Sequence, residues 1–225
     1  MSRNAGDYPL YYSGIRYEDM DDNKRAYEYY LESALSEDYC EAYYRLGRLY
    51  TEGEYVSEND PKGYHYFEIA YEKGSRSMLP GDYLMMGTYR HIEVRRGIEN
   101  GMSRDMVLAI KWYKCFQEAC KQRGNMEGYT SAFSHLGRAY QEPEIADYEK
   151  AYFCFKESGL KYSRTLLYLA KLHEYGLYVE KDHEKAMEYL DMILDNPEFI
   201  GDPFYDCAAA IIRYGSFDKG LGNFY

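Results

Sequence analysis

The chain has 225 residues, of which 46% are hydrophobic and 29% charged, so it can build a folded core. Its formal net charge of −11 argues against nucleic acid as the main partner, because binding phosphates needs a basic surface. No stretch approaches the about 18 apolar residues of a membrane span, and the N-terminus lacks a hydrophobic signal core, so a cytoplasmic protein without membrane contact is expected.

The first predicted elements are a capping segment and a helix. Residues 1–22 are aromatic and acidic, and we interpret them as an N-terminal cap. Asn23 then begins a helix over KRAYEYYLESAL, where small and aromatic residues recur at spacings of three and four.

Two further helices follow around a glycine turn. Asp38 is the expected N-cap of a helix that ends near Thr51, at the Glu52-Gly53 turn. Asp60-Pro61 opens the next helix, since proline in a first turn loses no hydrogen bond, and Gly74 closes it.

This two-helix pattern returns along the chain. Helix A carries an apolar residue followed by a small one: Leu46-Gly47, Met86-Gly87, Leu136-Gly137 and Leu169-Ala170. Helix B carries a small residue with aromatics three or four positions later, at Ala26, Gly63, Ala109, Ala151 and Ala186. The helix-B markers lie 37, 46, 42 and 35 residues apart, a period that indicates a helical repeat array.

The repeats differ mainly in their turns. Residues 46–63 align with residues 169–186 without a gap. The second repeat instead has a long turn over residues 91–103, before a helix expected over Arg104–Gln122. The third shortens its turn to QEPEIAD, where Pro143 ends helix A, and the last segment is a lone helix A before a tail over residues 216–225.

These residues resemble the Sel-one-like repeat, a relative of the tetratricopeptide repeat. The repeat pattern is Ala-x-x-x-Leu-Gly-x-x-Tyr, then Gly-x-x-Val, then a helix with Lys-Ala-x-x-Trp-Tyr. The first repeat matches at Ala42, Leu46, Gly47, Tyr50, Gly53, Val56, Asp60, Lys62, Tyr66 and Phe67. The last matches at Leu169, Gly176, Val179, Asp182, Lys185, Ala186 and Tyr189, and Ala109, Trp112, Tyr113, Ala132, Leu136, Gly137, Tyr140, Lys150 and Ala151 match between them. Departures are Arg90 and His173 in place of the helix-A Tyr, and Gly63 in place of the helix-B Ala.

The resemblance implies an all-α fold, a right-handed α/α superhelix or solenoid of antiparallel helix pairs. One array is expected over residues 23–215, with about four full repeats and partial end units. For function the resemblance implies a scaffold or adaptor that binds a partner protein or peptide through its concave helix-A surface. Because function does not follow from fold alone, this inference is associational.

The sequence carries no recognisable catalytic, cofactor or metal motif, so we expect no enzyme, no cofactor and no bound metal. Cys115 and Cys120 lie five apart on one predicted helix, an offset that does not bring two sulfurs onto one metal. The five cysteines form no CxxC pair, which favours reduced thiols. Ser134 and His135 are sequence neighbours and do not face each other on a helix. The alternative function is a small hydrolase-like enzyme built on the repeat scaffold.

The resemblance implies that helix A of each repeat lines the inner surface, so equivalent helix-A positions would form a row of basic and aromatic side chains there. The partner-binding residues expected there are Arg45, Arg48, Tyr50, Arg90, His135, Arg138, Tyr140, Lys171 and His173. Arginine and tyrosine are frequent interface anchors, so the row suits an acidic or carboxylate-ended peptide. The alternative is that these are ordinary solvated helix faces.

The long turn over residues 91–103 is a second candidate for partner contact. It contributes Arg95 and Arg96 to a basic middle section between two acidic ends. Long turns between elements are often functional, so we expect either a partner-contacting loop or a tolerated insertion.

Overall fold

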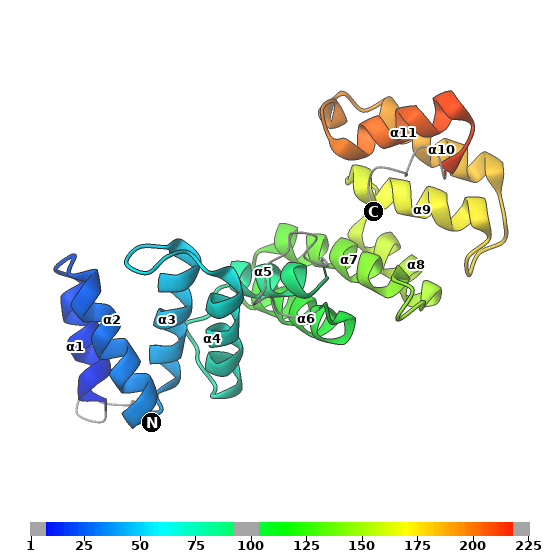
Figure 1. The fold of residues 1–225 in the computed structure, drawn as a ribbon. Coiled ribbons are helices and arrows are strands. Elements are labelled where there is room, and N and C mark those ends of the chain that lie inside the picture. Colours follow the sequence, from blue (N-terminus) through cyan, green and yellow to red (C-terminus); the bar gives the residue numbers. More distant parts are fainter. Residues whose placement is uncertain (1–7, 92–103, 218–225) are drawn as a thin grey trace. The chain divides into compact units, whose positions relative to one another are not determined.

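The computed structural model describes residues 8–91 and 104–217, so the predictions for Arg95, Arg96 and most of the 91–103 turn lie outside the described residues. Within the described residues every regular element is helical, which confirms the all-α prediction (Figure 1). The chain divides into two units, residues 1–104 and 105–225, and each is described here by itself.

Unit 1 is built from antiparallel helix pairs. Its helices are α1 (Pro9–Glu18), α2 (Asn23–Glu32), α3 (Cys40–Glu52), α4 (Asp60–Glu72) and α5 (Pro80–His91), with a π-helical turn, η1 (Ser33–Glu37), after α2. Helix α1 packs on α2, and α3 packs on α4 (Figure 1).

Unit 2 continues the same arrangement. Its helices are α6 (Met106–Gln122), α7 (Met126–Gln141), α8 (Tyr148–Ser158), α9 (Ser163–Tyr175), α10 (His183–Leu194), the 3₁₀ turn η2 (Pro197–Phe199) and α11 (Pro203–Tyr214). Helix α7 packs between α6 and α8, α9 packs on α10, and α11 follows α10. The predicted ends at Gln122 and before Pro143 agree with α6 and α7 to within two residues.

Most of the described helices begin at a side-chain cap. Asn59, Asp105, Asp147 and Asp182 each accept a hydrogen bond from the backbone N–H three residues later. The predicted N-cap Asp38 is wrong. It has a left-handed conformation (φ 48°) directly after η1, one residue too early, so Tyr39 takes the N-cap position of α3 without a side-chain bond.

The turns of the two gap-free repeats have the same geometry. Gly53 ends α3 with φ 68° and Gly176 ends α9 with φ 65°. This left-handed conformation favours glycine, because it places a Cβ close to the following carbonyl. The matching turns confirm that residues 46–63 and 169–186 are copies of one unit.

The pairs are held by an aromatic ring of helix B that lies directly over the small residue of helix A. A Cβ added to Gly47 would lie 2.5 Å from the Phe67 ring and 3.1 Å from the Gly63 carbonyl oxygen. In the same way a Cβ on Gly137 would lie 2.6 Å from the Phe155 ring. Phe67 and Phe155 are 2% and 0% exposed, so the rings have no space to move aside. The two helices of each of these pairs therefore approach each other closely at the glycine.

The same contact joins α1 to α2. A Cβ on Gly14 would lie 2.5 Å from the ring of Tyr30, which is 0% exposed. Tyr30 follows Ala26 by four positions, as Phe67 follows Gly63. The sequence signal for α1 as a helix A was therefore Gly14, within the segment that we had interpreted as a cap.

We predict that Gly47→Ala destabilises the chain by about 1–3 kcal/mol, because the added methyl overlaps the Phe67 ring. Chemical denaturation followed by circular dichroism measures the change. Gly81→Ala in α5 is the matched control: nothing lies within 4 Å of its Cβ position, so we expect no loss of stability there. Equal effects of the two substitutions would contradict the role of the ring contact.

Candidate functional site

Two of the predicted binding residues, Tyr50 and Tyr140, lie inside the repeat. They are 6% and 8% exposed. The Tyr50 hydroxyl accepts a hydrogen bond from the Lys62 ammonium at 2.6 Å, and that ammonium lies 4.2 Å from the centre of the Tyr50 ring. Lys150 lies 5.6 Å from the centre of the Tyr140 ring. Both tyrosines thus pack against a lysine of their own helix B.

The backbone of this position also closes the turn between the helices. The carbonyl of Tyr50 accepts the N–H of Asn59, that of Tyr140 accepts the N–H of Asp147, and that of His173 accepts the N–H of Asp182. His173 is half-buried against the rings of Tyr152 and Tyr189. Burial lowers the pKa of His173, which favours the neutral ring at neutral pH. Residues at this position of helix A therefore stabilise the turn between helices A and B.

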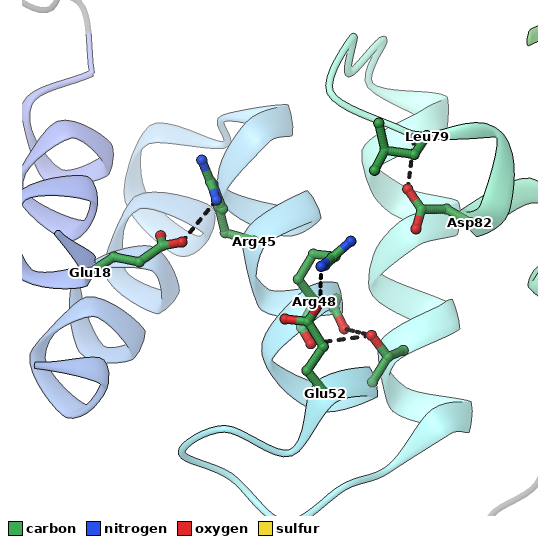
Figure 2. Close-up of polar contacts among 8 residues, drawn as sticks. Glu18, Arg45, Arg48, Glu52, Leu79 and Asp82 are labelled. Atoms are coloured by element: carbon green, nitrogen blue, oxygen red, sulfur yellow. Dashed lines mark hydrogen bonds and ion pairs between the residues drawn. The ribbon is translucent and has the colours of Figure 1, made fainter. Parts of the chain in front are cut away.

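The predicted arginines of unit 1 are already paired with carboxylates. Arg45 Nη1 lies 2.9 Å from Glu18 Oε1, and Arg48 forms an ion pair with Glu52 on its own helix (Figure 2). Arg90 binds Glu68 through two nitrogens, with Nη2 at 2.8 Å from Oε1. The unit 1 face therefore presents cations whose charge is balanced by the chain itself.

Unit 2 presents a different face, formed by α7 and α9. Three equivalent half-buried positions on each helix line it, namely Ser131, His135 and Arg138 on α7 and Arg164, Tyr168 and Lys171 on α9. Helices α7 and α9 are in contact. Of these residues the sequence analysis predicted His135, Arg138 and Lys171. It missed Arg164. This residue could have been found from its position, since it lies six residues before the small residue of helix A.

Two arginines of this α7–α9 face have no carboxylate partner. Among the described residues neither Arg138 nor Arg164 forms an ion pair, and the Arg164 guanidinium only contacts the Phe204 ring, at 5.1 Å from the ring centre. Burial lowers the pKa of Arg164, Tyr168 opposes this effect, and the nearby charge of Arg138 adds to it. Arginine side chains carry a positive charge in proteins, so both contribute cations to this face. The face is thus ready to accept negative charge.

His135 lies on this face. Its ring lies 5.2 Å from that of Tyr113. The hydroxyl of the neighbouring Ser134 accepts a hydrogen bond from Thr165 at 3.4 Å. In the described part of the chain no three His, Cys, Asp or Glu side chains are grouped as metal ligands would be.

A cavity of about 490 Å³ lies over α6, α7 and α8. Phe133, Leu136 and Phe153 line its apolar part, and Lys114 and Cys154 also border it. Burial raises the pKa of the Cys154 thiol to about 11, although Lys114 acts against this. All five cysteines of the chain are free thiols.

None of the helices in residues 8–91 and 104–217 combines the length and the apolar character that crossing a membrane requires.

We predict that Glu68→Gln destabilises the chain by about 1–3 kcal/mol, because Arg90 then keeps its charge without the carboxylate in a site where the two side chains are only 12% and 16% exposed. The matched control is Asp38→Asn, which removes the exposed pair with Lys73 and should leave the melting curve nearly unchanged. Urea denaturation compares the two variants, and a loss of equal size in both would contradict the prediction.

We predict that Cys154 is alkylated slowly. A thiol pKa of about 11 makes the thiolate fraction at neutral pH about a hundredfold smaller than for a thiol with the ordinary value of 9.0. The rate with iodoacetamide, measured by peptide mass spectrometry, should therefore rise about tenfold per pH unit up to pH ~10. The chain unfolded in urea is the control and should react at the ordinary rate. Equal rates in the folded and unfolded chains would refute the burial of this thiol.

Comparisons with known proteins agree with the repeat geometry. The sequence model of the Sel1 repeat matches residues 10–38, 40–75, 93–116, 134–161 and 163–194. The first match begins in the segment that we had interpreted as a cap, and it includes the α1–α2 pair. A comparison with curated protein sequences gave no match.

A solved Sel1 repeat structure has the same fold. The crystal structure of a Sel1 repeat protein from Oxalobacter formigenes aligns with a TM-score of 0.53 at 16% identity, over 99% of this chain and 88% of that one. The structure of c5321, a protective antigen of uropathogenic Escherichia coli strains with an SLR fold, aligns with a TM-score of 0.39 at 20% identity, over 93% of this chain and 50% of that one. Identities this low concern the fold alone. Since the repeat matches cover more than half of the residues, the chain belongs to the Sel1 repeat family.

Proposed function

We propose that this chain is a protein-interaction scaffold and that its α7–α9 face binds an acidic segment of a partner protein. Sel1 repeat proteins generally mediate protein–protein interactions. The observation that carries the finer proposal is the unpaired charge of Arg138 beside Arg164, in a chain with a net charge of −11. A chain with an excess of carboxylates has many ways to neutralise an arginine internally, and it does so in unit 1.

The chemistry of this face suits recognition of negative charge. Arginine donates up to five hydrogen bonds in a fixed planar arrangement that matches carboxylate and phosphate groups. Tyr168 lies between Arg164 and Lys171 on α9 and offers an aromatic surface beside the cations. Arginine and tyrosine together are enriched at the energetic centres of protein interfaces. The cytoplasmic location expected from the sequence stays a prediction.

Partner recognition is not assigned to Tyr50, Tyr140 and His173, which the sequence analysis includes among the binding residues. Their side chains pack in the joints between helices, so partner contact there would first require the joints to open. Recognition is therefore assigned to Arg138, Lys171 and His135, together with Arg164.

We predict that Arg138→Glu weakens partner binding about tenfold or more, since one charge is reversed at the centre of the face. The immobilised chain and the variant are compared by affinity capture with quantitative mass spectrometry, and the dissociation constant of each recovered partner is then measured by calorimetry. Circular dichroism melting checks that both proteins are folded.

Arg48→Glu is the matched control, because Arg48 has the same position in the repeat but is paired with Glu52. We expect the partners lost with Arg138→Glu to be retained with Arg48→Glu. An identical set of partners with unchanged affinities for all three proteins would contradict the assignment of recognition to the α7–α9 face.

A further inference from the structure

Unit 2 has a small polar cavity at the start of α9. Its volume is about 220 Å³, and it is bordered by α7, by residues 161–164 and by the segment that leads into α11. Ser131 and His135 contribute from α7, and Lys161, Tyr162 and Arg164 from the start of α9. The cavity thus adjoins the α7–α9 face and shares three of its residues.

Two buried donors of this cavity have no partner. Neither Nε of Arg164 nor the hydroxyl of Tyr162 forms a hydrogen bond within the described residues, although both atoms are shielded from solvent. An unpaired buried polar group costs about 1–3 kcal/mol, and folded proteins keep few of them. Both residues border the cavity, and an acceptor that reached these atoms would remove that cost.

The cavity is positively charged. Arg164 is cationic inside it, Lys161 lies at its edge with its ammonium 4.9 Å from the Tyr162 ring centre, and Arg138 is close enough to act on Arg164. The first-turn N–H groups of α9 add the positive end of a helix dipole, because its N-cap Tyr162 provides no side-chain acceptor.

One acidic residue, Asp202, borders the cavity, and both of its oxygens are occupied. Oδ2 accepts the Ser163 hydroxyl at 2.8 Å, and Oδ1 accepts the N–H of Phe204 at 2.7 Å as the cap of α11. Asp202 therefore holds α9 and α11 together. Its single charge leaves an excess of positive charge from Arg164 and Lys161.

We propose that this cavity binds a phosphate monoester, carried on a serine or threonine side chain of the partner protein. Such a group has a charge of about −1.5 to −2 at neutral pH and three acceptor oxygens. These oxygens match the guanidinium of Arg164, the ammonium of Lys161 and the hydroxyls of Tyr162 and Ser131. A carboxylate has one charge and two oxygens, so it would leave part of this donor set unpaired. That the phosphate is carried by a protein rests on the proposed scaffold function, whereas affinity for phosphate itself does not.

The test uses the full chain with three probes at constant ionic strength: inorganic phosphate, O-phosphoserine and glutamate. Calorimetry and thermal melting measure binding, since a ligand of the folded state raises the melting temperature. We expect saturable binding of phosphate and of O-phosphoserine, and none of glutamate at the same concentrations. Equal binding of glutamate, or no binding of phosphate, would overturn the proposal. Binding of inorganic phosphate without O-phosphoserine would overturn its assignment to a phosphorylated partner.

Variants separate binding from folding. Tyr162→Phe keeps the ring and removes only the unpaired hydroxyl, so the free chain should be as stable as before or more stable, while phosphate binds at least threefold more weakly. Lys161→Gln should weaken binding similarly. Lys181→Gln is the matched control, because Lys181 also lies two residues before a helix, α10, and it should bind as the unchanged chain does. Undiminished binding by both Tyr162→Phe and Lys161→Gln would overturn the site.

This experiment needs no partner, so its failure is distinguishable from a failure of the scaffold proposal. A chain that captures its partners through Arg138 but does not bind phosphate would refute the cavity and leave the face. If the chain binds phosphate but still captures the same partners after Arg138→Glu, the proposal for the α7–α9 face is refuted and the proposal for the cavity stands.

Discussion

The contact between one aromatic ring and one missing Cβ is the constraint on which the pairs α1–α2, α3–α4 and α7–α8 depend. Tyr30, Phe67 and Phe155 are 0%, 2% and 0% exposed, and each lies over a glycine of the preceding helix. The glycine lets two backbones approach closely, and the ring fills the space between them, as close packing of a protein interior requires. A single pair has too little core to be stable alone, so pairs are stacked along the chain.

This constraint also decides which positions remain for recognition. Three residues after the small residue of helix A, the chain turns toward helix B. The carbonyl of the residue at that position accepts the N–H of the Asn or Asp that caps helix B. Tyr50 and Tyr140 are therefore buried by the joint that they form. The positions one residue after the small residue, and two and six before it, point along the other side of helix A. These are the positions where Arg138, His135 and Arg164 lie.

The balance of charge then distinguishes the two units. In unit 1 the arginines of helix A pair with Glu18 and Glu52 (Figure 2) and with Glu68, and each pair is neutral. In unit 2 Arg138 and Arg164 lie near each other and form no ion pair within the described residues, although the chain as a whole is acidic. Asp202 acts on Arg164 only as a nearby charge. Two like charges held near each other in a half-buried site destabilise the free protein slightly, and a bound anion would relieve this repulsion.

The sequence by itself determined the repeat period, the helix pairs and the Gly53 and Gly176 turns, because residue spacing and glycine act locally. It also identified helix-A cations as candidates. It misplaced the cap at Asp38, since the π-turn before that residue is not visible in a pattern of spacings, and it passed over Gly14. Only the tertiary structure decided which cations are paired and which donors are buried without a partner. These properties depend on residues far apart in the chain, such as Glu68 with Arg90 or Asp202 with Ser163, whose distances no local pattern specifies.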